Sequence, residues 1–301
     1  EGGGGGGAGR RGRGAITHYS GTKNGKGPPA TNYEGNQQLK AGGELKYRVD
    51  SNLLRNATVN PDFGQVEADP SVLNLGAFET FFNERRPFFV EGKGLFSFNV
   101  NCVIVVDCRT GEGLFYSRRI GRSPQLSDIY GDASSPASTR ILGAGKVTGR
   151  LPGGFSLGVL DAVTQNVNGP LNTTHEPTTN YGVIRGNQDY DGGNGSFGFI
   201  LTGVNRSLDT STEPYLHHDA YSGGFDARRR FADRFEVSGS FDFIRVAGSA
   251  AAIARTQKDP VHLLQRPDGP LPFHLTRAFV GGRPRAFWCR PAGSEVRELG
   301  A

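Results

Sequence analysis

The sequence lacks methionine and is poor in two other residue types, with three cysteines and one tryptophan among its 301 residues. Position 1 is glutamate, so we expect a processed product or a fragment of a longer reading frame. No apolar run approaches the roughly 18 residues that a membrane-spanning helix needs, which excludes a helical membrane protein. A membrane β-barrel stays open, because its strands need only about 9–11 residues each.

The few cysteines exclude a disulfide framework. Cys102 and Cys108 flank a short apolar run and suit either a local disulfide bond in an oxidising compartment or two unrelated thiols. Their spacing is not that of a zinc site and no histidine lies near them. The adjacent His217 and His218 are interpreted as exposed loop residues, since no spaced third ligand is evident. We therefore predict no metal site and no cofactor.

Charge and composition narrow the class of protein further. Much of the net charge of +5 comes from arginine clusters near the two ends, neither on a recognisable binding fold, so we predict no nucleic-acid partner. The 46 glycines and the hydrophobic content of 36% argue against a conventional helical or α/β core. Residues 1–38 are a glycine-rich, low-complexity segment that we predict to be disordered.

Strand-like alternation is the main pattern of the rest of the chain. It predicts early strands at residues 43–49 and 53–59, another strand at 113–122, and three short-turn hairpins at 141–165, 181–207 and 220–246. Short turns on one side and long polar loops on the other are typical of an outer-membrane barrel. We predict an all-β, antiparallel, partial transmembrane barrel over residues 39–272, with a soluble β-sandwich or barrel as the alternative. Residues 273–301 show no strand period and form an unassigned tail.

Residues 60–98 combine eight phenylalanines with many charged residues, a mixture that suits neither a core strand nor an amphipathic helix. Phe81, Phe82, Phe88 and Phe89 need burial, whereas the intervening arginines need carboxylate partners if they are buried too. We predict a packed, charge-paired segment held inside or against a β scaffold. In a barrel it would form a constriction, with a role in gating or assembly.

The segment NPDFGQVEADPSVLNLGAFETFFNERRPFFVEG, followed by LFYSRRIGR, resembles the signature of an uncharacterised barrel family, domain of unknown function 5916. The similarity continues through the hairpins and covers roughly residues 43–268. The signature positions are Asn60, Pro61, Asp62, Phe63, Gly64, Gln65, Glu67, Asp69, Pro70, Glu79, Phe81, Phe82, Arg85, Arg86, Pro87, Phe88, Phe89, Glu91, Gly92, Arg118 and Arg119.

The resemblance implies an outer-membrane barrel of a Gram-negative bacterium, in contact with membrane lipid. In that family the barrel follows a carbohydrate-binding module of the family 9 type, so carbohydrate is an implied partner through a module that this chain lacks. The family's later strands are also missing, and residues after about 273 depart from its pattern. The resemblance brings no assigned catalytic residues.

Two groups of residues bear on an enzymatic function. Ser156 lies in a G-x-S-x-G match, but inside an alternating strand with no helix after it, which argues against a nucleophile. The acids Asp62, Glu67, Asp69 and Glu79 are weak candidates for glycoside hydrolysis. The simpler interpretation pairs the first three with Arg85, Arg86, Arg118 or Arg119 in a polar lumen. We expect a structural, transport or glycan-handling barrel, with a carbohydrate-active hydrolase and a soluble β-rich binding domain as alternatives.

Overall fold

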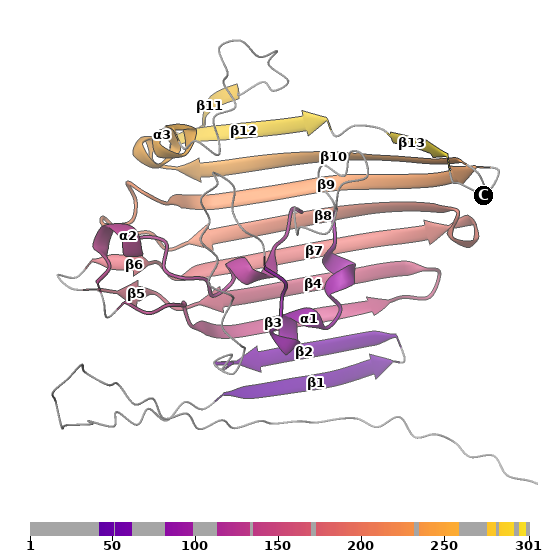
Figure 1. Ribbon diagram of the computed structural model, residues 1–301, viewed down its shortest axis with the longest axis horizontal. Helices are drawn as coiled ribbons and strands as arrows, with labels where there is room; N and C mark the ends of the chain where they lie inside the picture. Colours follow the sequence, from indigo (N-terminus) through magenta and orange to yellow (C-terminus); the bar gives the residue numbers. More distant parts are fainter. Residues whose placement is uncertain are drawn as a thin grey trace, which may run out of the picture.

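The computed structural model of the chain shows a broad antiparallel sheet with a few short helices over one face (Figure 1). The structure describes residues 42–50, 52–61, 82–98, 113–132, 135–169, 173–231, 235–258, 276–280, 283–291 and 295–298. The fold-class prediction is therefore confirmed as a mostly antiparallel β-sheet. In the described residues this sheet is open, with β1 at one edge and β11 at the other.

Eleven strands share the main sheet, and a separate two-stranded sheet lies beside it. Along the main sheet the strands run in the order β1 (Gly43–Asp50), β2 (Leu53–Val59), β3 (Ile141–Arg150), β4 (Phe155–Thr164), β7 (Thr179–Tyr190), β8 (Gly195–Arg206), β9 (His217–Phe231), β10 (Phe235–Gly248), β12 (Arg283–Pro291) and β11 (Thr276–Val280). A further strand, β13 (Glu295–Glu298), also pairs with β10. The small sheet joins β5 (Val167–Asn168) to β6 (Thr174–Glu176).

Local sequence explains the three central hairpins, and their prediction is confirmed. Between β3 and β4, Gly153 and Gly154 both have φ of +88°, a conformation that glycine adopts without a steric penalty. Between β7 and β8 the one-turn helix η4 (Asp191–Gly193) closes a tight connection. In the main sheet each strand from β1 to β10 pairs antiparallel with the next one along the chain, apart from β5 and β6. Residues 60–140 connect β2 to β3.

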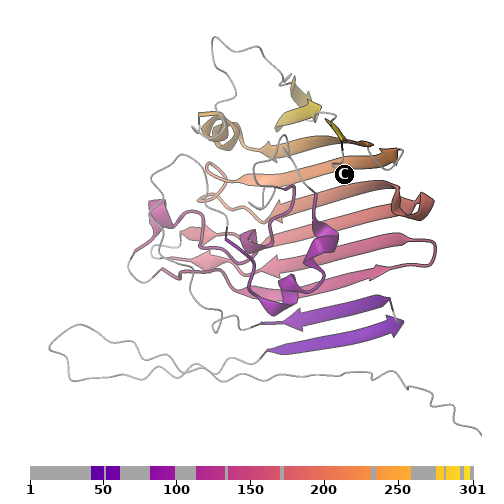
Figure 2. The same cartoon turned by 45° about the vertical axis from the view of Figure 1, so that its right-hand side comes forward.

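The two faces of the sheet differ in what covers them. Residues 82–98 and 113–130 cross one face, which we call the covered face, as two views of the ribbon agree (Figures 1 and 2). They carry four short helices: α1 (Pro87–Val90), η1 (Lys93–Phe96), η2 (Ser117–Arg119) and α2 (Ser127–Tyr130). The other face, which we call the open face, has no covering segment among the described residues.

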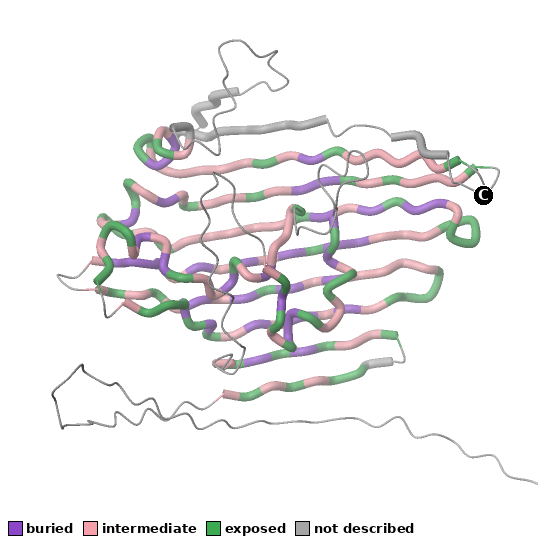
Figure 3. The backbone as a smooth tube through the Cα atoms, in the orientation of Figure 1, coloured by how far each residue is buried: buried purple, intermediate pink, exposed green. Residues whose placement is uncertain are grey.

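The core lies between this crossing segment and the covered face. Phe88, Phe89 and Phe96 from the segment pack with Leu160 and Val183 from the sheet, and all five are buried. Alternation along the strands then places the remaining side chains, so that buried residues alternate mainly with half-buried ones along β3, β4 and β7 (Figure 3). The prediction of a packed segment against a β scaffold is thus confirmed for residues 82–98.

The structure corrects two predictions. Residues 113–122 are not a strand but contain η2, because the carbonyls of Ser117 and Ile120 turn to accept hydrogen bonds from Arg86. The tail after residue 273, which shows no strand period in the sequence, contains β11, β12 and β13. After β10 the chain forms the helix α3 (Ala250–Lys258).

Candidate functional site

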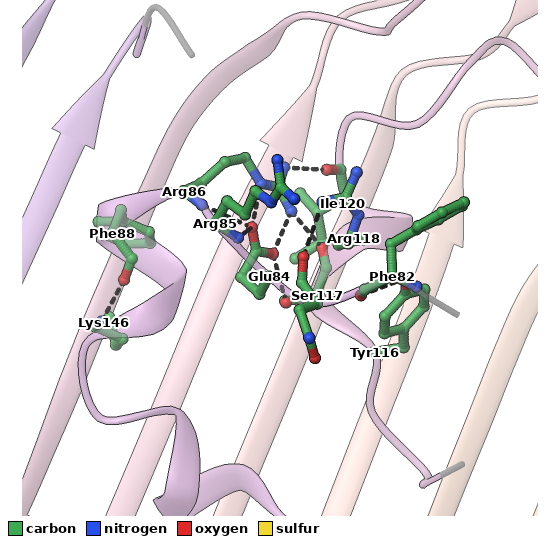
Figure 4. A network of polar contacts seen from close by, with 11 residues as sticks. Phe82, Glu84, Arg85, Arg86, Phe88, Tyr116, Ser117, Arg118, Ile120 and Lys146 are labelled. Carbon is green, nitrogen blue, oxygen red and sulfur yellow. Dashed lines mark hydrogen bonds and ion pairs between the residues drawn. The ribbon is translucent and has the colours of Figure 1, made fainter. Parts of the chain in front are cut away.

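A buried carboxylate, Glu84, joins the two parts of the crossing segment (Figure 4). It accepts five hydrogen bonds: from the backbone N–H groups of Arg85 and Arg86, from Nε and Nη2 of Arg86 at 2.9 and 2.7 Å, and from the Ser117 hydroxyl at 2.6 Å. The Glu84 side chain is 1% exposed and that of Arg86 is 12% exposed. This is a two-point, charge-assisted pair, the stronger class of protein hydrogen bond.

The Arg86 guanidinium also holds the second part of the segment directly. It donates to the carbonyl oxygens of Ile120 at 2.6 Å and Ser117 at 2.8 Å, and its Cζ lies 4.2 Å from the centre of the Phe89 ring. Because these donors also have partners, desolvation of the ion pair is well compensated. Arg86 therefore fixes residues 117–120 relative to residues 84–89.

A second clamp lies beside this network (Figure 4). The Tyr116 hydroxyl donates to the Phe82 carbonyl at 3.0 Å and accepts from the Phe82 N–H at 2.9 Å. Arg118 donates to the Asn83 carbonyl at 3.0 Å, with its Cζ 5.8 Å from the Phe82 ring centre. Residues 82–86 and 116–120 thus behave as one bonded unit.

Lys146 of β3 fastens this unit to the sheet. Its Nζ donates to the carbonyl oxygens of Phe88 and of Glu91, the second at 2.5 Å, and lies 4.9 Å from the Phe88 ring centre. The Glu91 carboxylate in turn accepts from Asn56 of β2 at 2.7 Å and pairs with Lys46 of β1 at 3.2 Å. The end of α1 is therefore tied to three neighbouring strands.

Glycines on the covered face make room for the phenylalanines that follow. A Cβ added at Gly158 of β4 would lie 3.0 Å from the Phe96 ring, and one added at Gly224 of β9 would lie 2.5 Å from the Phe98 ring. Arg185 of β7 lies over the Phe98 ring, with its Cζ 5.5 Å from the ring centre. Rings and strands are in direct contact there because these positions carry no side chain.

Arg185 also forms an ion pair across an intervening strand. It reaches Asp226 of β9 with two hydrogen bonds of 2.6 and 3.0 Å, passing over Gly198 of β8. A Cβ at Gly198 would lie 2.5 Å from Arg185 Nη1. A glycine in the middle strand is thus a condition for this pair.

Glu84 and Glu91 of the crossing segment have pKa values set by opposing effects. Burial of Glu84 raises its pKa, but the hydrogen bonds and charge of Arg86, with the Ser117 hydroxyl, hold the pKa below the ordinary value. Burial likewise raises the pKa of Glu91, and Lys46 and Asn56 lower it by more. Both carboxylates are therefore ionised and structural, and neither is a proton donor at neutral pH.

The predicted site residues divide into three groups. Phe82, Arg85, Arg86, Phe88, Phe89, Glu91, Gly92, Arg118 and Arg119 lie in the crossing segment, together with Pro87 at the first turn of α1. Asn60 and Pro61 follow β2, where Asn60 accepts a hydrogen bond from Arg140 at 2.5 Å. Outside the described residues lie Asp62, Phe63, Gly64, Gln65, Glu67, Asp69, Pro70, Glu79, Phe81, Cys102 and Cys108, so their predicted roles stay predictions.

Ser156 lies inside β4, as its alternating neighbours predict. Sequence reasoning missed Lys146, Asn56, Ser117, Arg185 and Asp226, which come from strands or turns distant in the chain. The sequence did contain a sign of them: each is a polar residue, either on the polar face of an alternating strand or in a turn.

Comparison with protein families identifies the family of the chain. A family model described as Domain of unknown function (DUF5916) matches residues 19–213, more than half of the sequence. The chain belongs to this family. Neither the curated proteins nor the solved structures include a match. In this DUF5916 chain the match spans the crossing segment, its clamps and strands β1 to β8.

The chemistry open to this site is limited by how fully its groups are bonded. In the described ranges, no group of three or more histidine, cysteine, aspartate or glutamate side chains is arranged to hold a metal ion. No helix in the described part of the chain is long and apolar enough to cross a membrane. The arrangement of Glu84, Arg86 and Lys146 holds a segment against a sheet, and offers no free nucleophile.

Proposed function

We propose that this sheet is part of the wall of an outer-membrane β-barrel, and that the crossing segment occupies its lumen as a constriction. The role is structural or in transport, and we assign no reaction. The observation that carries the proposal is the reversed polarity of the sheet. The middle of its open face is apolar, whereas its covered face carries charged residues such as Lys146, Arg185 and Asp226 beside the core that the crossing segment covers.

The open face presents rows of apolar side chains to the surroundings. Direct cross-strand pairing aligns Val147, Val159, Ile184 and Leu201 in one row, and Leu157, Phe199, Phe225 and Phe241 in the next with Gly186 between them. Ile184, Leu201, Phe225 and Phe241 are between 42% and 46% exposed. Contiguous apolar area of this kind on a protein marks an interaction surface, and lipid is the surface that fits two adjacent rows that together cross six strands.

The height of the apolar band fits a bilayer. On β9 the open face runs from Phe231 at the short-turn end to Tyr221 near the long-loop end. Ten residues at about 3.3 Å each, tilted by roughly 40°, give a band of about 25 Å, as in outer-membrane barrels. Arg229 lies near the short-turn end of this band. Its Cζ is 5.5 Å from the Tyr190 ring centre and its guanidinium forms a 2.8 Å ion pair with Asp191, which suits a cation at the level of the lipid headgroups.

Three charged residues lie on this face toward the ends of the strands: Asp161 and Arg245 in the row of Tyr221, and Arg229 between Phe225 and Phe231. Within the two apolar rows, the charged residue is Arg55 of β2, which is exposed between Val147 and Tyr47. Its long side chain allows the guanidinium to reach toward the interface. Charged residues on the covered face are instead held by partners, as in the Arg185–Asp226 pair and the Lys146 contacts. Polar inward and apolar outward is the alternation of a membrane barrel.

Two experiments test the proposal. Fractionation of cells that produce the full-length protein should recover it in the outer membrane, extractable only with detergent; recovery in the soluble periplasmic fraction would reject the proposal. Phe225→Arg should reduce membrane assembly, since a cation at the middle of the lipid-facing band costs about 2–4 kcal/mol. Thr210→Arg adds the same charge in an exposed turn and should assemble normally.

The alternative of a soluble β-rich domain predicts the opposite result for Phe225→Arg, namely a neutral or solubilising effect at a position that is already 46% exposed. The hydrolase alternative depends on Asp62, Glu67, Asp69 and Glu79, which lie outside the described residues. No observation in the described part of the chain favours it.

A further inference from the structure

Two glycines of the covered face mark where the crossing segment rests on the middle of the sheet. They lie in one cross-strand row, where a Cβ added at Gly158 would lie 3.0 Å from the Phe96 ring and one added at Gly224 would lie 2.5 Å from the Phe98 ring. The short-turn ends of the strands extend past the described parts of the segment in both ribbon views (Figures 1 and 2). We call the covered face between this row and the short turns the short-turn field.

Every position that β3, β4, β7, β8, β9 and β10 contribute to the short-turn field is polar or glycine. In three successive cross-strand rows the residues are Arg150, Ser156, Asn187, Gly198, Asp226 and Ser240, then Asp189, Ser196, Arg228 and Ser238, then Arg230 and Glu236. On the open face the same stretch of the strands holds Leu157, Phe199 and Phe225. Polar groups keep their hydrogen bonds where water reaches them, so the field suits a wall that faces water.

Solvent does reach this field. The side chains of Arg150, Arg228 and Arg230 are 58%, 42% and 40% exposed. Ser156 and Ser238, on β4 and β10, are half-buried. Both sides of the field are therefore accessible, and Ser156 is part of this polar wall.

On the side of β3 and β7 the charges of the field balance one another. Arg150 pairs with Asp189 at 2.9 Å, and Arg185, in the row on which the segment rests, holds Asp226 through two hydrogen bonds. Asp242 of β10 also lies in the row on which the segment rests, is 5% exposed and has interactions of its own. None of these groups adds net charge to the field.

Positive charge is in excess where β9 and β10 meet in the field. Arg228 and Arg230 both pair with Glu236, with 3.6 and 3.5 Å between the guanidinium nitrogens and the same carboxylate oxygen. A guanidinium does not lose its proton in a protein, so both arginines are charged. Two cations therefore share one anion, and one unit of positive charge is left without local compensation.

The opposite, long-loop end of the covered side is occupied. Leu126 N–H donates to the carbonyl of His175 in β6 at 3.0 Å, and the Tyr130 hydroxyl donates to the Ser211 carbonyl at 3.1 Å. These bonds join the crossing segment to the loop between β4 and β7 and to the loop between β8 and β9. The segment and the loops bonded to it thus extend from the middle of the sheet to this end.

We propose that the short-turn field lines a water-filled vestibule that opens at the short-turn end and favours small anionic solutes over cationic ones. The inference rests on the barrel proposed above, in which the covered side is the lumen, and it names the class of solute that enters. The crossing segment and the loops bonded to it close the vestibule toward the long-loop end. The surplus charge of Arg228 and Arg230 raises the local concentration of anions, because solutes of opposite sign are attracted to it.

Thiol labelling of the full chain, in the cell fraction that contains it, tests the vestibule. In a chain whose native cysteines are replaced by serine, Ser156→Cys and Ser238→Cys each place a single thiol in the field, and both should react with water-soluble methanethiosulfonate reagents. Ala227→Cys places a thiol on the open face of β9, at an exposed position that lipid should protect. Protection of Ser156→Cys or Ser238→Cys would overturn the vestibule alone, whereas labelling of Ala227→Cys would reject the lipid contact on which the barrel is based.

Charged reagents measure the preference for anions at Ser238, which stands opposite Arg228 in the register of β9 and β10. The quantity compared is the ratio of the reaction rate of the anionic sulfonatoethyl reagent to that of the cationic trimethylammonioethyl reagent. At low salt this ratio should be about threefold higher for Ser238→Cys than for a free thiol in solution. At an ionic strength of about 1 M the Debye length falls to about 3 Å, and the difference should disappear.

Three charge variants in the Ser238→Cys chain separate attraction of anions from access alone. Arg228→Gln should abolish the preference for the anionic reagent, and Glu236→Gln should increase it. Arg150→Gln removes the same charge from β3, with four strands between it and β10, and should leave the ratio unchanged. A ratio equal to that of the free thiol, or one that Arg228→Gln does not lower, would overturn the assignment to anions.

Discussion

Removal of the Glu84 charge should release the crossing segment from the sheet. In Glu84→Gln, the Arg86 guanidinium stays buried but loses its ion pair, and an amide nitrogen replaces one of the oxygens that now accept five hydrogen bonds. Breaking a buried pair from one side costs roughly 3–5 kcal/mol. Arg86 keeps its bonds to the carbonyls of Ser117 and Ile120, so we expect the lower end, about 3 kcal/mol.

This free energy acts locally, because the strands have their own hydrogen-bond ladder. At about 1.4 kcal/mol for each factor of ten, 3 kcal/mol raises the open population of the segment by roughly 100-fold. Hydrogen exchange of residues 82–98 measures this opening, and limited trypsin digestion at Arg85 and Lys93 provides a second readout. Circular dichroism should show an unchanged sheet.

The matched control is Asp191→Asn, which removes one carboxylate from an exposed pair with Arg229, where the side chains are 54% and 37% exposed. Exposed pairs contribute about 0–1 kcal/mol, so exchange in residues 82–98 should not change. If Glu84→Gln opened the segment no more than Asp191→Asn did, the inference that this carboxylate holds the segment would be refuted.

Three further predictions follow from the same contacts. Because Glu84 has a lowered pKa, its contribution is present above its ordinary pKa of 4.5 and is lost as pH falls through the folded value. Acidification should therefore lower the protection factors of residues 82–98, taken relative to the intrinsic exchange rate at each pH, and Glu84→Gln should flatten that dependence. Gly224→Ala should displace Phe98 and lower the stability measured by urea unfolding, since the added Cβ would lie 2.5 Å from the ring. Adding Phe98→Ala to that variant should restore part of the lost stability. Gly239→Ala, where the added Cβ meets open space, should leave the stability unchanged. Gly198→Ala should separate Arg185 from Asp226 and lower the stability of the protein. Adding Asp226→Asn to that variant should then lower the stability little further, which a double-mutant cycle measures. If the two losses of stability were additive, the inference that Gly198 makes room for the ion pair would be wrong.

The sheet could be predicted from sequence because its signals are local. Alternation places Phe241 outward and Asp242 inward, and the structure has them 43% and 5% exposed. Turn residues such as Gly153 mark the hairpin ends by their backbone conformation. Neither signal depends on contacts that are distant in the chain.

The rest could not be predicted because long-range contacts decide it. Residues 113–122 have strand-like composition, but Arg86, more than 30 positions earlier, draws the carbonyls of Ser117 and Ile120 out of an extended form. β12 begins and ends beside prolines, Pro284 and Pro291, which weigh against a strand in any local reading. The contacts of Lys146 with Phe88 and Glu91 need the sheet to exist before they can be recognised.

The Lys146 contacts also bear on the order in which the molecule assembles. Phe88 leaves the ribosome 58 positions ahead of the lysine that binds its carbonyl, and the glycine that receives Phe98 comes later still, in β9. These contacts form only after a long loop has closed, at a cost in chain entropy, so docking of the segment follows pairing of the later strands. Its phenylalanines therefore stay exposed until the later strands have paired, which leaves the segment open to aggregation during that interval.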